Sequence, residues 1–259
     1  MSAWSDDAAS PRHDLDEDPS ALDFSLEAMH GRVLRAQSKD LGAIGGGTAP
    51  ASLGYRVVRW EDRGEGFGAS EAGALLDVSP YESRDGLIYR KAHRIRTESK
   101  PVMRIGQFLE HGILALYAHE SGEDVEAWVG EDGKPQTLAS LAQPLMIASP
   151  DARVRDTRRG IEIKFSGGGR GWGTGDVLSD LPAYTIHDGR AAPLMYQLQA
   201  QQCMAVTGFD EWPIVGLIRG RLRVYAVERH EGAIARLHEE IPRAWDEVLR
   251  LRSAVAREE

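Results

Sequence analysis

Hydrophobic residues recur at two different spacings along this chain, and the change of spacing predicts its elements. Between Met103 and His119 they return every three or four residues, as in a helix with one buried face. From Val125 to Val129, and again from Ile161 to Phe165, they alternate with polar residues, as in strands. The full pattern predicts helices at 71–76, 85–94, 103–119, 193–207 and from 232 onward, and strands at 125–129, 145–148, 161–165, 214–218 and 222–227. Helices on both sides of a strand block indicate a mixed α/β domain with helices on the faces of a sheet.

Residues with special backbone or capping preferences predict where several of these helices begin and end. Ser70 is expected to cap the helix that begins at Glu71. Gly208 is expected to close the helix that ends at Thr207. Pro242 is expected to kink or divide the C-terminal helix.

The first 50 residues have a different composition from the remainder of the chain. Residues 1–30 carry eight acidic side chains and one arginine, so −7 of the net charge of −9 lies there. The segment ends in the glycine run Gly45-Gly46-Gly47 and holds few aromatic residues. We therefore expect a disordered acidic and glycine-rich extension over residues 1–50, followed by one folded domain over residues 51–259.

Composition excludes several classes of protein. The single cysteine, Cys203, excludes a disulfide framework and a cysteine-rich metal site. There is no apolar run long enough to span a membrane, and the acidic start does not have the form of a secretory signal. We therefore expect a protein of the reducing cytoplasm.

The pattern that points to chemistry is a Ser-Pro-Asp turn followed by a Glu-x-Lys strand. Because alternate strand residues share a face, Glu162 and Lys164 are expected to point together, away from Ile161 and Ile163. Asp151 lies one short hairpin earlier and can therefore lie beside Glu162. Two carboxylates suit a hard cation such as Mg²⁺, and a neighbouring lysine can stabilise charge on a phosphate. Either half of this pattern, taken alone, is typical of an ordinary solvated surface.

Four blocks, taken in order, make the chain resemble the YqaJ-like viral recombinase family, which includes the lambda-type exonucleases. They are Arg63 with Gly68–Ala72 and Val78–Tyr81, then Gly106–Glu110, then Ala148–Ala152 with Ile161–Lys164, and finally Tyr196–Gln201 with Met204–Gly208. The resemblance implies a restriction-endonuclease-like core with a mixed central β-sheet flanked by helices. One departure is the absence of the usual Cys-Pro after the catalytic lysine, where this chain has Phe165-Ser166.

The same resemblance implies a role for each matching side chain. It implies that Mg²⁺ is the cofactor, that Mn²⁺ can substitute for it, and that two ions are bound. The implied metal ligands are Glu110, Asp151, Glu162 and the carbonyl of Ile163. The implied catalytic residues are Glu110, Asp151, Glu162, Lys164 and Gln199. The implied substrate-binding residues are Arg63, Ser70, Tyr196 and Gln201, with Arg63 and Ser70 at the 5′-phosphate.

The activity that the resemblance implies is a Mg²⁺-dependent exonuclease of phage-type DNA recombination. Such an enzyme would digest the 5′-ended strand of linear double-stranded DNA and leave 3′ overhangs for a single-strand annealing protein. A homotrimer in a bacterial or phage-infected cell is implied as well, with no membrane partner.

Two alternatives stay open on the residues alone. A restriction- or repair-type endonuclease would have the same metal site, and only Arg63 and Ser70 argue for a DNA end. A catalytically silent DNA-end-binding module could keep the fold, although the intact Asp151, Glu162 and Lys164 argue against it. Trp172, in a glycine-rich segment, is expected to anchor its loop more readily than to stack on a base.

Overall fold

The structure is a computed structural model that describes residues 54–96, 98, 100–173 and 192–257. The expected N-terminal extension, residues 1–50, lies outside these described residues. In the part of the chain that is described, no helix is long and apolar enough to cross a membrane.

The strands of the described residues form two mixed sheets, where the sequence predicted one central sheet. The first sheet has the order β1-β4-β5-β2, with strands Tyr55–Val58, Thr137–Ser140, Met146–Ala148 and Phe67–Gly68. The second has the order β3-β6-β7-β8-β9, with strands Val125–Ala127, Ala152–Val154, Gly160–Ser166, Ile214–Ile218 and Arg221–Tyr225. The mixed α/β fold that the sequence predicted is confirmed.

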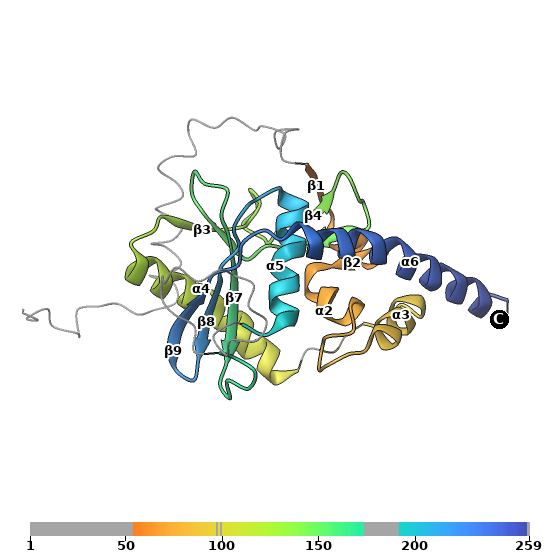
Figure 1. Ribbon diagram of the computed structural model, residues 1–259, viewed down its shortest axis with the longest axis horizontal. Coiled ribbons are helices and arrows are strands. Elements are labelled where there is room, and N and C mark those ends of the chain that lie inside the picture. The colour runs from red at the N-terminus through yellow and green to blue at the C-terminus, as the bar shows by residue number, and fades with distance from the viewer. Residues whose placement is uncertain (1–53, 97, 99, 174–191, 258–259) are drawn as a thin grey trace, which may run out of the picture. The chain divides into compact units, whose positions relative to one another are not determined.

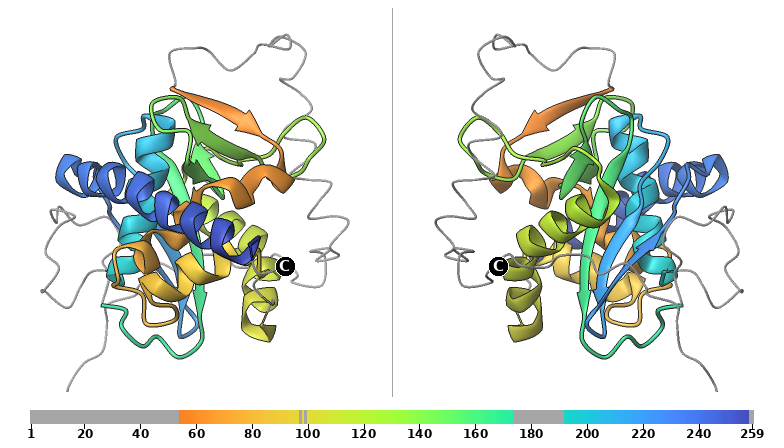
Figure 2. Two further views of the ribbon diagram at one scale, coloured as in Figure 1. Left: turned by 90° about the vertical axis from the view of Figure 1, so that its right-hand side faces the viewer. Right: turned by 90° about the vertical axis from the view of Figure 1, so that its left-hand side faces the viewer.

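Helices cover the sheets and connect them (Figure 1). The α-helices are α2 (Ala72–Leu75), α3 (Arg84–Ala92), α4 (Pro101–Ser121), α5 (Leu194–Thr207) and α6 (Glu231–Val255). Two 3-10 helices, η3 (Trp60–Glu65) and η4 (Ala69–Glu71), lie on either side of β2. Figure 2 shows α6 lying along α3, and α6 also contacts α2 and α5.

The second sheet separates α4 from α5, and the alternation of β7 determines which side chain meets which helix. Ile161 and Ile163 lie in a buried cluster with Ile113 and Tyr117 of α4. The opposite face of the sheet contributes Ile214 and Ile218 of β8 to the main core, which contains the buried side of α5. Because β7 pairs with β8 in the register Glu162↔Ile214, the even-numbered residues of β7 share this α5 face. Glu162 and Lys164 therefore point away from the α4 cluster.

Of the three helix features predicted from single residues, the cap at Gly208 is present, whereas the cap at Ser70 and the break at Pro242 are not. Gly208 closes α5 with a left-handed φ of 75°, as the sequence predicted. Ser70 does not act as an N-cap: it lies inside η4, where the backbone N–H of Gly68 donates to the carboxylate of Glu71 instead. Pro242 does not divide the C-terminal helix, because α6 is continuous from Glu231 to Val255.

Gly160, the first residue of β7, should not tolerate a side chain. A Cβ atom at Gly160 would overlap the six-membered ring of Trp212, which is fully buried. We expect Gly160→Ala to lower the free energy of unfolding by about 1–3 kcal/mol, because a packed core resists added volume. Urea unfolding monitored by circular dichroism measures this loss.

Gly112→Ala on α4 is the matched control, because a Cβ there would meet nothing within 4 Å. A helical glycine replaced by alanine should raise the unfolding free energy by about 0.5–1 kcal/mol. Equal effects of the two substitutions would contradict the close packing of Trp212 on Gly160.

Candidate active site

The β6–β7 hairpin brings Asp151 and Glu162 together. Asp151 immediately precedes β6, which pairs antiparallel with β7 in the register Ala152↔Ile161. The backbone N–H of Ile163 donates to Asp151 Oδ2 at 2.7 Å. The carboxylate of Asp151 is thereby held against the strand that carries Glu162 and Lys164.

Glu162 is a fully buried carboxylate, with 0% of its surface exposed. Its Oε1 atom accepts hydrogen bonds from Lys164 Nζ and from Gln199 Nε2. Its Oε2 atom is buried and has no hydrogen-bond partner among the described residues. Burial, and then the neighbouring charge of Asp151, raise the pKa of Glu162 above its ordinary value.

Lys164 lies between this carboxylate pair and an aromatic ring. Its Nζ atom lies 5.3 Å from the ring centroid of Tyr196, close enough for a cation–π contact. Burial opposes the positive charge on Lys164, but the carboxylates of Glu162 and Asp151 outweigh it and raise the pKa of the lysine. Lys164 therefore remains a cation throughout the neutral range.

Glu110, on α4, lies close enough to Asp151 and Lys164 for their charges to affect its pKa. Burial first, and the charge of Asp151 second, raise the pKa of Glu110 to about 7, while Lys164 acts in the opposite direction. Three carboxyl groups, from α4, the turn before β6 and β7, thus share one electrostatic environment with a single lysine. Carboxyl groups with raised pKa values, as for Glu110 and Glu162, are typical of functional sites.

The donor set fits a hard divalent cation that keeps most of its water. The unpartnered Oε2 of Glu162 and the carboxylate of Asp151 are oxygen donors side by side, and Mg²⁺ commonly binds through one or two carboxylates. Among the described residues, no three His, Cys, Asp or Glu side chains converge into one ligand group. Glu110 interacts with Asp151 electrostatically in this arrangement.

The glutamines of α5 divide into one that faces the carboxylates and others that bind backbone. Gln199 donates to Glu162, as described above. Gln202 donates to the carbonyls of Phe67 and Ile147, at 2.7 and 2.9 Å, and so connects α5 to two strands of the first sheet.

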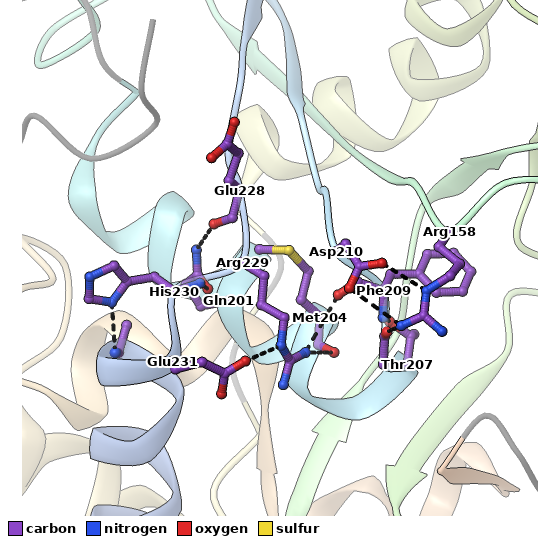
Figure 3. A network of polar contacts seen from close by, with 12 residues as sticks. Arg158, Gln201, Met204, Thr207, Phe209, Asp210, Glu228, Arg229, His230 and Glu231 are labelled. Carbon is purple, nitrogen blue, oxygen red and sulfur yellow. Dashed lines mark hydrogen bonds and ion pairs between the residues drawn. The ribbon is translucent and has the colours of Figure 1, made fainter.

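Gln201, for which the family resemblance implies substrate binding, lies in a buried network of backbone hydrogen bonds. Its Nε2 atom donates to the carbonyl of Glu228 at 2.7 Å, and its Oε1 atom accepts from the N–H of His230 at 2.8 Å. Figure 3 shows this side chain within a polar network that connects the end of α5 to the segment before α6. Gln201 is fully buried, and both of its amide atoms form hydrogen bonds with backbone groups.

Arg63 and Ser70, the expected phosphate-binding pair, lie next to each other. Arg63 Nη2 donates to Ser70 Oγ at 3.4 Å, and the side chain of Ser70 is exposed. Because η4 has only three residues, it offers few free backbone N–H groups to a phosphate. The phosphate contacts expected at this helix start would therefore come from the side chains of Arg63 and Ser70.

The rings of Tyr196, Trp172 and Tyr225 form a cluster beside Lys164, and the sequence did not predict that they lie together. Trp172 stacks on Tyr196 with 5.3 Å between ring centroids, and its ring lies 5.2 Å from that of Tyr225. The hydroxyl of Tyr225 donates to the carbonyl of Gly173 at 3.1 Å. Trp172 therefore anchors its loop, as the sequence predicted. Its position as a lone aromatic residue among glycines was the feature of the sequence that indicated this role.

Glu110 should destabilise the metal-free protein as pH rises. A folded-state pKa raised from 4.5 to about 7 means that ionisation of Glu110 costs folding free energy, which begins near the lower value and is complete above the upper one. In the presence of a chelator we expect Glu110→Gln to raise the melting temperature at a pH of about 8 and to have little effect at a pH of about 4. Glu120→Gln, at an exposed position of the same helix, is the control, and an equal pH dependence for both variants would contradict the assignment.

Part of the chain matches the sequence model of a known protein family. The model of the YqaJ-like viral recombinase domain matches residues 60–210, which is more than half of the chain. No curated protein sequence matches the chain.

The fold resembles solved nucleases at low sequence identity. LHK-Exo in complex with dAMP is 23% identical with a TM-score of 0.55, over 76% of this chain and 94% of that one. A second structure of this alkaline exonuclease, from Laribacter hongkongensis, is 22% identical with a TM-score of 0.52, over 77% and 95% of the two chains. A phage-related exonuclease from Haemophilus somnus 129PT is 14% identical with a TM-score of 0.53, over 73% and 96%. The shared fold agrees with the match over residues 60–210, and the chain belongs to the YqaJ-like viral recombinase domain family.

Proposed function

We propose that this protein is a divalent-metal-dependent exonuclease that digests linear double-stranded DNA. The observation that carries the proposal is the convergence of Asp151, Glu162 and Lys164 on one face of the second sheet. Family membership and the fold shared with two exonucleases support it.

The residues that would hold the metal are Asp151 and Glu162, together with the carbonyl of Ile163 and, from α4, Glu110. When bound, Mg²⁺ or Mn²⁺ would neutralise charge on the scissile phosphate and lower the pKa of a bound water. Burial and the charge of Asp151 raise the pKa values of Glu110 and Glu162, and the cation would offset both effects. Two ions are part of this proposal, and their number rests on the family resemblance.

Lys164 would orient the attacking water and stabilise the charge that develops on the phosphate. It is suited to this role because it stays protonated while lying beside both carboxylates. Gln199, hydrogen-bonded to the same Oε1 atom as Lys164, would hold the carboxylate of Glu162 in position. Tyr196 would form the wall beside the lysine and contact the substrate there.

Choice of a DNA end would depend on Arg63 and Ser70. An exposed hydroxyl beside a guanidinium is a suitable site for the terminal 5′-phosphate. Digestion of the 5′-ended strand would leave a 3′ overhang for a single-strand annealing protein. Assembly as a homotrimer in the cytoplasm belongs to the same proposal and depends on the family resemblance.

Removal of either metal-binding carboxylate should abolish digestion without unfolding the protein. We expect Asp151→Asn and Glu162→Gln each to lower the cleavage rate about 100-fold or more, since each removes an anionic ligand. Chelation of the wild type should stop digestion of linear duplex, and added Mg²⁺ or Mn²⁺ should restore it. Glu239→Gln, at an exposed position of α6, is the matched control. Digestion that survives exhaustive chelation would overturn the metal-dependent mechanism.

The role of Arg63 separates an exonuclease from an endonuclease. We expect Arg63→Ala to slow digestion of 5′-phosphorylated ends about 10- to 150-fold relative to 5′-hydroxyl ends, the size of one charge-assisted contact. Arg56→Ala, at an exposed arginine of β1, should leave this ratio unchanged. Equal slowing of both ends, or cleavage of closed circular DNA as fast as linear DNA, would favour the endonuclease alternative.

A further inference from the structure

The register of the second sheet places two arginines on the same face as the candidate catalytic lysine. Lys164 of β7 pairs with Gly216 of β8, and Gly216 pairs with Arg223 of β9. Paired residues share a face, so Lys164 and Arg223 lie in one row across three strands, about 10 Å apart along the sheet. Arg221, two residues earlier on β9, projects from the same face about 7 Å away.

Among the residues that the structure describes, these two arginines have no acidic partners, unlike the arginines of the β6–β7 hairpin. Of the latter, Arg153, Arg155, Arg158 and Arg159 form ion pairs with Glu126, Asp124, Asp210 and Glu123. Within the described residues, neither Arg221 nor Arg223 forms an ion pair or a side-chain hydrogen bond. Arg221 is exposed and Arg223 is half-buried, so both guanidinium groups are available to a ligand.

The hairpin that carries these arginines is attached to the loop that follows β7. Arg219 and Gly220 have φ angles of 52° and 72°, and two-residue hairpin turns of type I′ require positive φ at both positions. The side chain of Arg219 folds back and its Nε atom donates to the carbonyl of Gly168 at 2.9 Å. This contact holds the β8–β9 turn against the end of the strand that carries Lys164, where Figure 1 shows the two loops at one end of the sheet.

The aromatic cluster connects the two cations across the same face. Lys164 lies over Tyr196, Tyr196 stacks on Trp172, and Trp172 contacts Tyr225. Tyr225 lies two residues from Arg223 on the same side of β9. Burial raises the pKa of Tyr225, and the charge of Arg223 acts in the opposite direction. A chain of ring contacts, with Tyr225 buried at its end, therefore links the position of Lys164 to the strand that carries Arg223.

We propose that Arg221 and Arg223 bind backbone phosphates of the DNA strand whose scissile phosphate lies at Lys164. The inference rests on the proposed nuclease function and adds to it a surface that holds the strand beyond the reacting bond. Unpaired guanidinium groups on the same face as a lysine match the repeating charge of a phosphodiester backbone, which arginine can contact with two parallel hydrogen bonds. Contacts of this kind position the strand and carry no sequence preference.

The test is the salt dependence of DNA binding under conditions in which no strand is cut. A blunt linear duplex is titrated with the full-length chain in the presence of chelator, at several salt concentrations. We expect Arg221→Gln/Arg223→Gln to weaken binding about 10-fold or more, and to reduce the slope of log affinity against log salt by about 2, equally for duplexes of different sequence. Each single variant should reduce the slope by about 1.

Two controls separate lost phosphate contacts from lost net charge or a damaged fold. Arg236→Gln/Arg243→Gln removes the same charge from exposed positions of α6 and should change neither affinity nor slope beyond error. Arg221→Lys/Arg223→Lys keeps the charge and should recover the wild-type slope with weaker binding.

The other possible results distinguish failure of the proposed nuclease function from failure of the phosphate-binding role of Arg221 and Arg223. If the wild type neither binds nor digests linear duplex, the proposed function is wrong and this inference fails with it. If the wild type does both and Arg221→Gln/Arg223→Gln keeps the wild-type slope, only the inference is overturned. In that case the two arginines are the charged residues that protect an exposed edge strand from pairing with another chain. An equal loss in the α6 control would also overturn the inference.

Discussion

The carboxylate of Glu162 is removed from solvent while a second carboxylate lies beside it. Burial of a charge without compensation is costly, and the surrounding elements supply that compensation here. Lys164 and Gln199 both donate to one oxygen of Glu162, and the backbone of β7 donates to Asp151. The second oxygen of Glu162 stays unsatisfied among the described residues, so the compensation is incomplete. A site that is short of positive charge in the absence of a ligand is suited to receive a cation.

Helix α5 carries much of the positioning that this arrangement requires. It is buried on most sides, and its side chains satisfy backbone groups of elements far away in the sequence. Gln202 binds carbonyls of β2 and β5, and Gln201 binds the segment before α6. The helix is thereby held to the first sheet and to the segment before α6, which leaves Gln199 little freedom as it approaches Glu162. The two glutamines that never meet the carboxylates therefore still determine where the third one lies.

The sequence predicted the active-site strand better than the elements around it, and the reason is physical. Strand β7 alternates between an apolar core face and a polar site face, so the sequence shows the two-residue period of a strand. The short hairpin before β7 also indicates that Asp151 lies beside Glu162. Strand β4, Thr137–Ser140, is buried at every position and therefore shows no alternation. Strands β1 and β2 are too short to establish a period. The role of Gln201 could not be inferred because its hydrogen-bond partners, Glu228 and His230, become neighbours only after folding.

Net charge is a poor guide to what this protein can bind, because its charges are not evenly distributed. Of the net charge of −9, −7 resides in residues 1–30, so the remainder of the chain is close to neutral. Within that remainder, the arginines of one hairpin are neutralised by acidic neighbours, whereas Arg221 and Arg223 are not. Phosphate contacts act over distances of about one Debye length, roughly 8–10 Å in physiological salt, so distant acids have little effect on them. A short row of unpaired cations beside the carboxylates can therefore attract a phosphate backbone in a protein whose overall charge would repel it.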